Sequence, residues 1–404
     1  MSSFPPRECG LATFTADVKT AVDRANPGGC SWVMAMDVPH QRHAYPRSVR
    51  LQIAREDRLQ YVEAARFVND MDCDLVNVQH EYGLFGGVYG SYLLDFINVV
   101  QRPVVLTLHT TLPDPPQELR TITRELVAAS AETVVLARTA VDILQRDYGI
   151  PAEQLHFIPH GVPNVRLLPT QAAKRALGIA DRRVIVTCGL INPGKGIEYA
   201  IEGVAGLVKE FPDVLYLVVG ETHPGVRAES GEAYRESLQA RVHELGLDNH
   251  VRFVNRYLRY RELVLYLLAS DVYMVPYLNL DQIVSGTLAY ALGCGRAIVS
   301  TPSIYAREVL ADGRGVLVPP RSAEAIATMT AGLLRHDGWR TRMQQAAYDL
   351  GHGMIWPNVA RRYLEVYELA VERTRQRDEL VREYLPPKVS LPIEPSELEH
   401  VFVR

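Results

Sequence analysis

Short apolar runs rich in β-branched residues alternate with amphipathic segments along almost the whole chain. Val104–Leu108 and Val214–Val219 have the length and composition of buried strands. Glu232–Leu245 and Ala323–Leu334 instead repeat their apolar residues at helical spacing. Regular alternation of strands and helices requires parallel sheets with right-handed crossovers. Since 404 residues suffice for two domains, the sequence predicts an α/β protein with two doubly wound, Rossmann-like domains.

A polar stretch containing two prolines, residues 162–181, separates two sets of predicted strands. We therefore expect an N-terminal domain over residues 1–165 and a C-terminal domain over residues 166–356. Residues 357–404 should form a final helix and a tail of little periodicity. Ligands of such sheets bind at the carboxyl ends of the strands, which places the expected site in a cleft between the domains.

The start of the chain departs from this pattern. Residues 1–10 have the composition of a turn that follows a strand, and Leu11–Ala25 has that of the next helix. The sequence therefore predicts that the first strand of the N-terminal sheet is missing. Further along, the periodicity predicts one helix over Arg50–Asn69.

Composition excludes several classes of protein. With 43 basic and 47 acidic residues the net charge is −4, so we expect no nucleic-acid partner. The five cysteines are scattered without CxxC spacing, which is typical of reduced thiols in a cytoplasmic protein. No apolar run reaches the length of a transmembrane segment, and no signal peptide is visible. The oligomeric state stays open.

A glycine-rich turn between a predicted strand and a predicted helix is the strongest candidate for a site. It runs from Gly189 to Gly196 and includes Asn192, Gly194 and Lys195. Free backbone N–H groups and a helix N-terminus favour an anion such as phosphate, and the lysine adds a mobile positive charge. A tight turn with an exposed lysine is the alternative.

A second candidate anion site is Ser285-Gly286-Thr287, at the N-terminus of a helix rich in small residues. It follows the predicted strand Val272–Val275 and a polar loop that contains Gln282. Close packing of the small-residue helix is the structural alternative for the residues that follow.

Several polar residues of the first half of the chain also lie where strands of the predicted sheet end. They are Arg7 and Gly10 in the first turn, His80 and Glu81, His109, and His160 at the domain boundary. Each has a structural alternative: exposed charges, a loop histidine, a core histidine or a hinge residue. No HExxH, paired-cysteine or Walker-type pattern is present, so no metal site is predicted.

In this order, these motifs resemble retaining glycosyltransferases of the GT-B fold, similar to the large family 4 group. The resemblance covers about residues 1–375 and rests on the Pro5–Gly10 turn, His109, Pro159–Val162, the Gly189–Gly196 loop and the Val219–Glu221 turn. It implies an interdomain active-site cleft and metal-independent transfer, with retention, from a UDP- or GDP-linked sugar to a hydroxyl acceptor. The implied partners are these small molecules, and no cofactor is expected.

The resemblance also implies roles for the candidate residues. Lys195 and the backbone amides of the two anion sites would hold the phosphate, and His109 and Gln282 would contact the donor sugar. The implied donor-binding residues are Gly10, Gly189, Asn192, Gly194, Gly196, Glu221, Ser285, Gly286, Thr287 and Tyr290. Those expected to orient the acceptor or a sugar are Arg7, His80, Glu81 and His160.

Two departures from the family pattern weaken the nucleotide end of this site. The loop's arginine is Leu190 here, which removes one charge-assisted contact to a diphosphate. The family's Glu-x7-Glu pair falls on Gln282 and Tyr290, and a tyrosine cannot accept two ribose hydroxyls as a carboxylate can.

Two other functions therefore stay open. One is a GT-B disaccharide phosphorylase that uses inorganic phosphate, since Ser285-Gly286-Thr287 resembles a phosphate-binding motif of glycogen-type phosphorylases. The other is a sugar- or nucleotide-binding protein without turnover.

Overall fold

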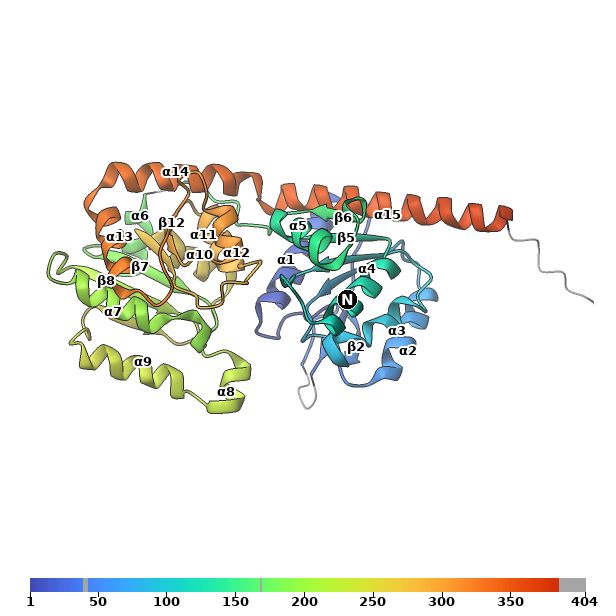
Figure 1. The fold of residues 1–404 in the computed structure, drawn as a ribbon, viewed down its shortest axis with the longest axis horizontal. Helices are drawn as coiled ribbons and strands as arrows, with labels where there is room; N and C mark the ends of the chain where they lie inside the picture. The colour runs from blue at the N-terminus through green and yellow to red at the C-terminus, as the bar shows by residue number, and fades with distance from the viewer. Residues whose placement is uncertain (39–42, 168, 385–404) are drawn as a thin grey trace, which may run out of the picture.

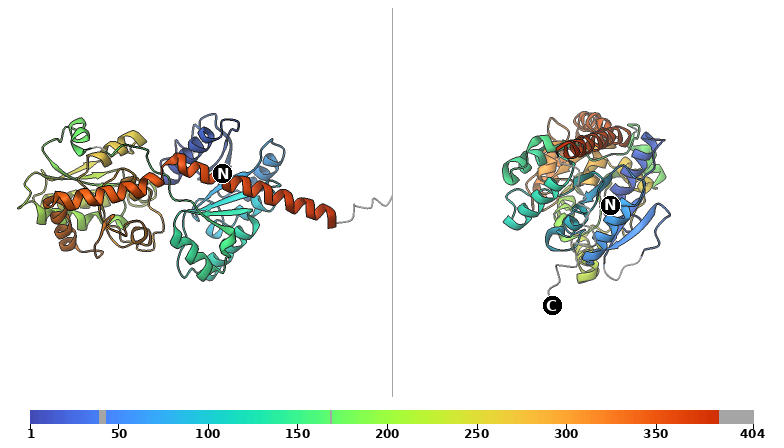
Figure 2. Two further views of the ribbon diagram at one scale, coloured as in Figure 1. Left: turned by 90° about the horizontal axis from the view of Figure 1, so that it is seen from above. Right: turned by 90° about the vertical axis from the view of Figure 1, so that its right-hand side faces the viewer.

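The computed structural model describes residues 1–38, 43–167 and 169–384. The chain forms two lobes side by side, each built on a parallel sheet, and a long C-terminal helix runs from one lobe along the other (Figures 1 and 2). This confirms the predicted fold class. The predicted tail beyond residue 384 lies outside the described residues, and no helix within them is both long and apolar enough for a bilayer crossing.

The C-terminal lobe contains a six-stranded sheet in the order β9-β8-β7-β10-β11-β12. Its strands are β7 (Arg183–Cys188), β8 (Val214–Val219), β9 (Val251–Val254), β10 (Val272–Val275), β11 (Ala297–Ser300) and β12 (Val316–Leu317). The strand order reverses between β7 and β10, and such a switch point opens a crevice at the carboxyl ends of the strands.

Helices cover both faces of this sheet (Figure 1). They are α6 (Thr170–Ala176), α7 (Ile197–Leu207), α8 (Pro224–Ser230), α9 (Ala233–Glu244), α10 (Tyr260–Ala269), α11 (Gly286–Gly293), α12 (Ile304–Val309), α13 (Ala323–Arg335) and α14 (Asp337–Gly353). The strands β7, β8, β10 and β11 are almost completely buried, which explains why their sequences are nearly continuous apolar runs.

The N-terminal lobe contains a β1–β2 pair and a four-stranded sheet in the order β3-β4-β5-β6. The strands are β1 (Val33–Asp37), β2 (Val49–Ala54), β3 (Val76–His80), β4 (Val104–Leu108), β5 (Glu132–Val135) and β6 (Leu155–Phe157). The helices are α1 (Gly10–Ala25), α2 (Arg58–Asn69), α3 (Leu93–Ile97), α4 (Gln117–Ala129) and α5 (Arg138–Tyr148).

The prediction of a missing first strand is wrong in one respect: no strand is assigned before α1 among the described residues, but the first two residues occupy the strand's place. Ser2 donates its amide to the Met34 carbonyl at 3.0 Å and accepts from the Met36 amide at 2.9 Å. On its other side the Met1 carbonyl accepts from the Gln79 amide at 3.1 Å. The two residues therefore join β1 to β3, although they are too few to form an apolar run that a sequence pattern could reveal.

The single helix predicted over Arg50–Asn69 is also wrong in its first part. Val49–Ala54 forms β2, which pairs in parallel with β1, and α2 begins only at Arg58. Asp57 caps this helix, since its carboxylate accepts a hydrogen bond from the Leu59 amide at 3.1 Å.

The last described helix, α15 (Trp356–Tyr384), belongs to the core of the N-terminal lobe. Its buried side chains pack against Phe14, Val18, Ala21 and Val22 of α1; they include Val359, Ala360, Tyr363, Val366 and Ala370. Arg373 of α15 also pairs with the buried Glu132 carboxylate at 2.7 Å. The chain thus returns to its first domain after completing the second.

Candidate active site

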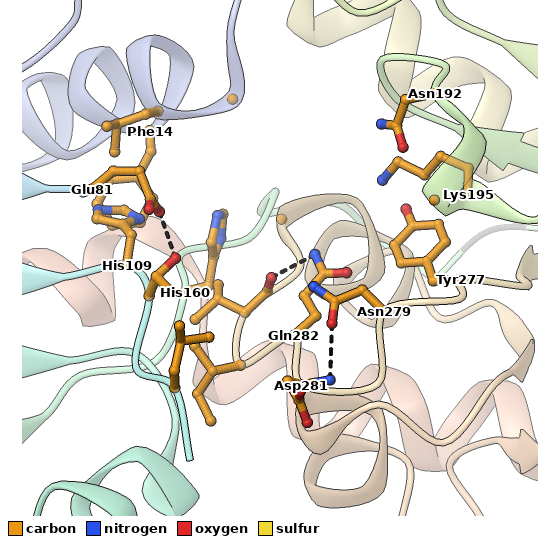
Figure 3. Close-up of a pocket in the computed structure, with 18 residues that line it drawn as sticks. Phe14, Glu81, His109, His160, Asn192, Lys195, Tyr277, Asn279, Asp281 and Gln282 are labelled. Atoms are coloured by element: carbon orange, nitrogen blue, oxygen red, sulfur yellow. Dashed lines mark hydrogen bonds between the residues drawn. The ribbon is translucent and has the colours of Figure 1, made fainter. Parts of the chain in front are cut away.

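A cavity of about 450 Å³ lies between the lobes, at the carboxyl ends of β3, β4, β7 and β10 (Figure 3). It brings together most of the predicted site residues from both halves of the chain. Those that line it are Gly10, Glu81, His109, His160, Asn192, Gly194, Lys195, Gln282 and Gly286.

A second cavity of about 150 Å³ adjoins the first, and both are lined by Gly10, Phe14, His160 and Gly286. The predicted residues Gly189, Glu221 and Tyr290 also line it. Its other walls are mainly apolar or aromatic: Leu190, Val219, Tyr257, Leu258 and Leu263. The site as a whole therefore has a polar compartment and a smaller, less polar one.

The glycine-rich loop holds Lys195 at the edge of the first cavity. The Nζ atom lies 3.7 Å from the centre of the Tyr277 ring, in cation–π geometry. A Cβ atom at Gly196, where φ is +59°, would lie 2.2 Å from the Pro276 carbonyl oxygen, so this close approach requires glycine. Lys195 is the only lysine or arginine lining either cavity in the described chain, which makes it the main partner for an anion there.

His109 faces the cavity from the end of β4 as a neutral imidazole. Burial lowers its pKa to about 3. Its Nε2 atom lies 2.8 Å from Oε1 of Gln79, whose own amide nitrogen donates to Asn77, so His109 is the donor in this bond. Its ring also meets the edge of Phe14 at 4.7 Å between centroids. The ring is thereby fixed, and its Nδ1 atom remains an acceptor.

Glu81 is the carboxylate that the N-terminal lobe places at the cavity wall (Figure 3). It accepts the Thr110 hydroxyl at 2.6 Å and the Tyr82 amide at 3.1 Å. Burial raises the pKa of its carboxyl group, and both hydrogen bonds oppose that shift. The arrangement can receive a hydroxyl donor of a ligand at a fixed position.

His160 stands where the two cavities meet. Its Nδ1 atom donates to the Gly161 carbonyl at 2.7 Å, and burial lowers its pKa to about 4. A Cβ atom at Gly286 would lie 2.9 Å from Nε2 of this ring. The absence of a side chain at Gly286 therefore lets helix α11 approach the histidine.

Gln282 lies on the C-terminal side of the first cavity, next to Asn279 and Asp281 (Figure 3). It donates its amide nitrogen to the Val284 carbonyl at 2.9 Å, which leaves its Oε1 atom as an acceptor. The side-chain carbonyl of Asn279 accepts the Asp281 amide at 3.1 Å and so shapes this loop.

The Ser285-Gly286-Thr287 segment begins α11 as predicted, but only Gly286 lines the cavities. The Ser285 hydroxyl caps the helix by accepting from the Leu288 amide at 3.4 Å. The Thr287 hydroxyl lies 3.2 Å from that of Tyr277. These two side chains thus support the walls of the site.

Two of the residues predicted to orient the acceptor or a sugar are not brought into either cavity. Arg7 donates to the Met36 carbonyl at 3.3 Å, beside β1. His80 points from β3 into the core, where it stacks on Phe85 with centroids 5.7 Å apart. Burial lowers the pKa of His80 to about 3, and neither ring nitrogen finds a partner among the described residues.

Sequence reasoning missed several residues of the site. Phe14 lies on the buried face of α1, and Tyr277 and Thr110 each follow a predicted strand. Their places two residues beyond β10 and β4 were a usable signal, since chemistry gathers at such strand ends. Among the described residues, no group of three or more His, Cys, Asp or Glu is arranged to hold a metal ion.

Comparison with known proteins gives matches over most of the chain. The family model "Glycosyl transferases group 1" matches residues 170–350, and "Glycosyltransferase Family 4" matches residues 23–166. A D-inositol 3-phosphate glycosyltransferase of Xylanimonas cellulosilytica is 28% identical over 68% of this chain and 68% of its own length. A phosphatidyl-myo-inositol mannosyltransferase of Mycobacterium leprae is 26% identical over 67% of this chain and 68% of its own.

Solved structures agree in fold. Anabaena HepE, in complex with UDP and glucose, superimposes with a TM-score of 0.68 at 16% identity, covering 91% of this chain and 98% of that one. Sucrose-phosphate synthase from Thermosynechococcus elongatus gives a TM-score of 0.72 at 18% identity, over 90% and 94% of the two chains.

Proposed function

Because this chain is a group 1 glycosyltransferase with the GT-B fold, we propose that it moves a sugar from a nucleotide-sugar donor to a hydroxyl acceptor, with retention and without a metal ion. The observation that carries the donor assignment is the position of Lys195. Lys195 is a cation held on a glycine-rich turn, and it lines a cavity large enough for a sugar. That cavity adjoins a smaller, largely apolar one.

The two compartments suit the two ends of such a donor. The sugar would occupy the first cavity, between His109 and Gln282, and the diphosphate would lie against Lys195 and the loop amides. In the transfer, the bond from the anomeric carbon to the phosphate oxygen breaks and a bond to the acceptor oxygen forms. The acceptor proton leaves with the nucleoside diphosphate.

The residues of the site have complementary tasks in this proposal. Lys195 stabilises the negative charge that grows on the departing phosphate. His109, neutral because of its burial, accepts a sugar hydroxyl without adding a positive charge beside the electron-poor ring carbon. Glu81 receives and orients a hydroxyl on the side of the N-terminal lobe.

The test is turnover by the purified protein with UDP- and GDP-sugars in the presence of EDTA. We expect EDTA-resistant release of nucleoside diphosphate and a product whose anomeric configuration, read by NMR, equals that of the donor. Lys195→Ala should lower kcat/KM at least about a hundredfold, because it removes a charged contact to the leaving group. Lys209→Ala, at an exposed site on the same lobe, is the matched control. Inversion, or activity restored only by a divalent ion, would contradict the proposal.

A disaccharide phosphorylase is the second candidate, and Leu190 favours it. The Leu190 side chain lines the smaller cavity, where the family pattern has an arginine. Among the described residues that line the two cavities, Lys195 is therefore the only cation that could bind a diphosphate. Release of a sugar 1-phosphate that depends on inorganic phosphate would identify that activity. Nucleotide binding with no transfer to any acceptor would instead indicate a binding protein.

A further inference from the structure

Glu221 is fixed at the turn after β8, directly against the phosphate loop. A Cβ atom at Gly220, where φ is +137°, would lie 2.0 Å from the Gly189 carbonyl oxygen. The Glu221 carbonyl accepts the Ile191 amide at 2.8 Å. The backbone of this glutamate is therefore packed against, and hydrogen-bonded to, the loop that carries Lys195.

The Glu221 side chain lines the smaller cavity with one carboxylate oxygen unused. Its Oε2 atom accepts from Arg227 at 3.2 Å. Its Oε1 atom is buried and has no hydrogen-bond partner among the described residues, and the residue is only 9% exposed. A buried carboxylate oxygen without a donor is unfavourable, so a bound ligand that supplies a donor would be stabilised there.

The charge around Glu221 determines what kind of ligand group can approach. Glu8, from the turn before α1, comes close to it: burial, then hydrogen bonding of the protonated Glu8 carboxyl to Glu221, and then the negative charge of Glu221 raise the pKa of the Glu8 carboxyl group. Glu8 therefore competes with a ligand for the Glu221 carboxylate only while it holds a proton. Arg227 balances only part of this negative charge, because it also pairs with Glu232. A phosphate would be repelled at this end of the site, whereas a neutral hydroxyl donor would not.

The other hydroxyl-bearing side chains of the smaller cavity are already engaged. The Tyr290 hydroxyl donates to Asp17 at 2.6 Å. That of Tyr257 lies 2.8 Å from the Thr13 hydroxyl. Among the described side chains lining this cavity, Glu221 Oε1 is thus the carboxylate acceptor left for a ligand.

We propose that Glu221 Oε1 accepts a hydrogen bond from a ribose hydroxyl of the donor's nucleoside. This rests on the proposed function, because it takes the ligand to be a nucleotide sugar whose phosphates lie at Lys195. It assigns to Glu221 a carboxylate role that Tyr290 cannot perform. The base then lies against the apolar walls of the smaller cavity, and the two ends of the site are distinguished by charge: Lys195 at the phosphates and Glu221 at the ribose.

Calorimetric titration of UDP, GDP and their 2′-deoxy and 3′-deoxy analogues tests this proposal. For the nucleotide that binds, we expect at least one deoxy analogue to bind wild type about tenfold more weakly. Glu221→Gln keeps an acceptor oxygen but loses the charge, so it should weaken binding of the parent nucleotide severalfold and reduce the discrimination against the analogue. Glu229→Gln, an exposed carboxylate of the nearby helix α8, should leave both affinities unchanged.

Each other outcome has a distinct meaning. If the nucleotide binds but Glu221→Gln keeps the wild-type affinities, the inference is wrong and the proposed function stands. If Glu221→Gln weakens the nucleotide and both deoxy analogues equally, the ribose contact is overturned. If neither nucleoside diphosphate binds wild type at millimolar concentration, the nucleotide donor fails and the inference fails with it. Glu221→Asp, with its melting temperature measured in parallel, replaces the glutamine variant if that variant does not fold.

Discussion

The hydroxyl of Tyr290 donates a 2.6 Å hydrogen bond to the carboxylate of Asp17, and this bond joins the two lobes beside the smaller cavity. Tyr290 lies on α11 and Asp17 on α1, so the contact depends on how the domains approach each other. Burial raises the pKa of Asp17 to about 6, although the tyrosine hydrogen bond partly opposes the shift.

Asp17→Asn should make the protein more stable at neutral pH. In the unfolded chain Asp17 ionises near the ordinary aspartate pKa of 3.8, whereas the folded state holds the proton up to about pH 6. Between these values the folded state binds more protons, so stability from this group falls as pH rises from about 4 to 6. We expect a gain of about 1–3 kcal/mol at pH 7.5 and little change at pH 4, measured by denaturant unfolding.

The asparagine still accepts the Tyr290 hydroxyl, so the lobes should stay in contact. Asp142→Asn, at an exposed position of α5, serves as the control and should change stability little at either pH. An equal change at pH 4 and pH 7.5 for Asp17→Asn would show that its ionisation is not responsible.

If the donor is a nucleotide sugar as proposed, Leu190→Arg should strengthen binding of the nucleoside diphosphate about tenfold, since a guanidinium would join Lys195 at the proposed phosphate site. Leu190 lines the smaller cavity directly after Gly189 of the loop. Titration at low and high salt measures the effect, which should shrink as salt screens the added charge. Unchanged affinity at low salt would place the phosphates elsewhere.

His80→Leu should stabilise the protein, and more strongly in acid. Burial lowers the pKa of His80 to about 3, so below pH 6.5 the unfolded chain binds a proton that the folded chain refuses. The wild-type protein therefore loses stability as pH falls below 6.5, the pKa of His80 in the unfolded chain, and the leucine variant does not have this loss. The difference in unfolding free energy between the variant and wild type should be about 2 kcal/mol larger at pH 5 than at pH 8. Urea unfolding at both pH values measures it. If His80→Leu instead lowered transfer activity and left stability unchanged, His80 would have a role in substrate binding or catalysis.

Gly196→Ala should destabilise the protein and abolish the placement of Lys195. The substitution introduces strain at φ +59° and a Cβ atom 2.2 Å from the Pro276 carbonyl oxygen. Gly246→Ala separates the two effects, because its φ is +66° but a Cβ atom there would meet nothing within 4 Å. Thermal melts and kcat/KM should show a larger loss for Gly196→Ala than for the control, and equal losses would contradict the close approach.

Much of the fold could be predicted because buried strands give continuous apolar runs in the sequence. Val104–Leu108, Val214–Val219 and Val272–Val275 form strands with the bounds that their apolar runs predicted. Val49–Ala54 was assigned to a helix from its pattern of apolar residues. The assignment failed because this strand lies at the edge of the sheet and mixes exposed with buried residues. Met1 and Ser2 replace a strand with backbone pairing alone, which leaves no side-chain pattern to detect.

The site was predictable where chemistry follows a strand and not where it depends on distant partners. His109 and Lys195 were found because each follows an apolar run. The Lys195–Tyr277 and Tyr290–Asp17 contacts join residues far apart in the chain, so only the folded arrangement reveals them. For His80, a strand end next to glycines suggested substrate, but its alternating position on β3 turns the ring into the core.

The path of α15 has a consequence for how the chain is completed during synthesis. Val359, Tyr363 and Val366 fill the core beside α1, more than three hundred residues after the helix that they cover. The lobe that leaves the ribosome first is therefore the last to be finished, because its apolar face on α1 stays open until the end of the chain emerges. Until then, the earliest part of the protein is an unfinished domain, dependent on a segment not yet translated.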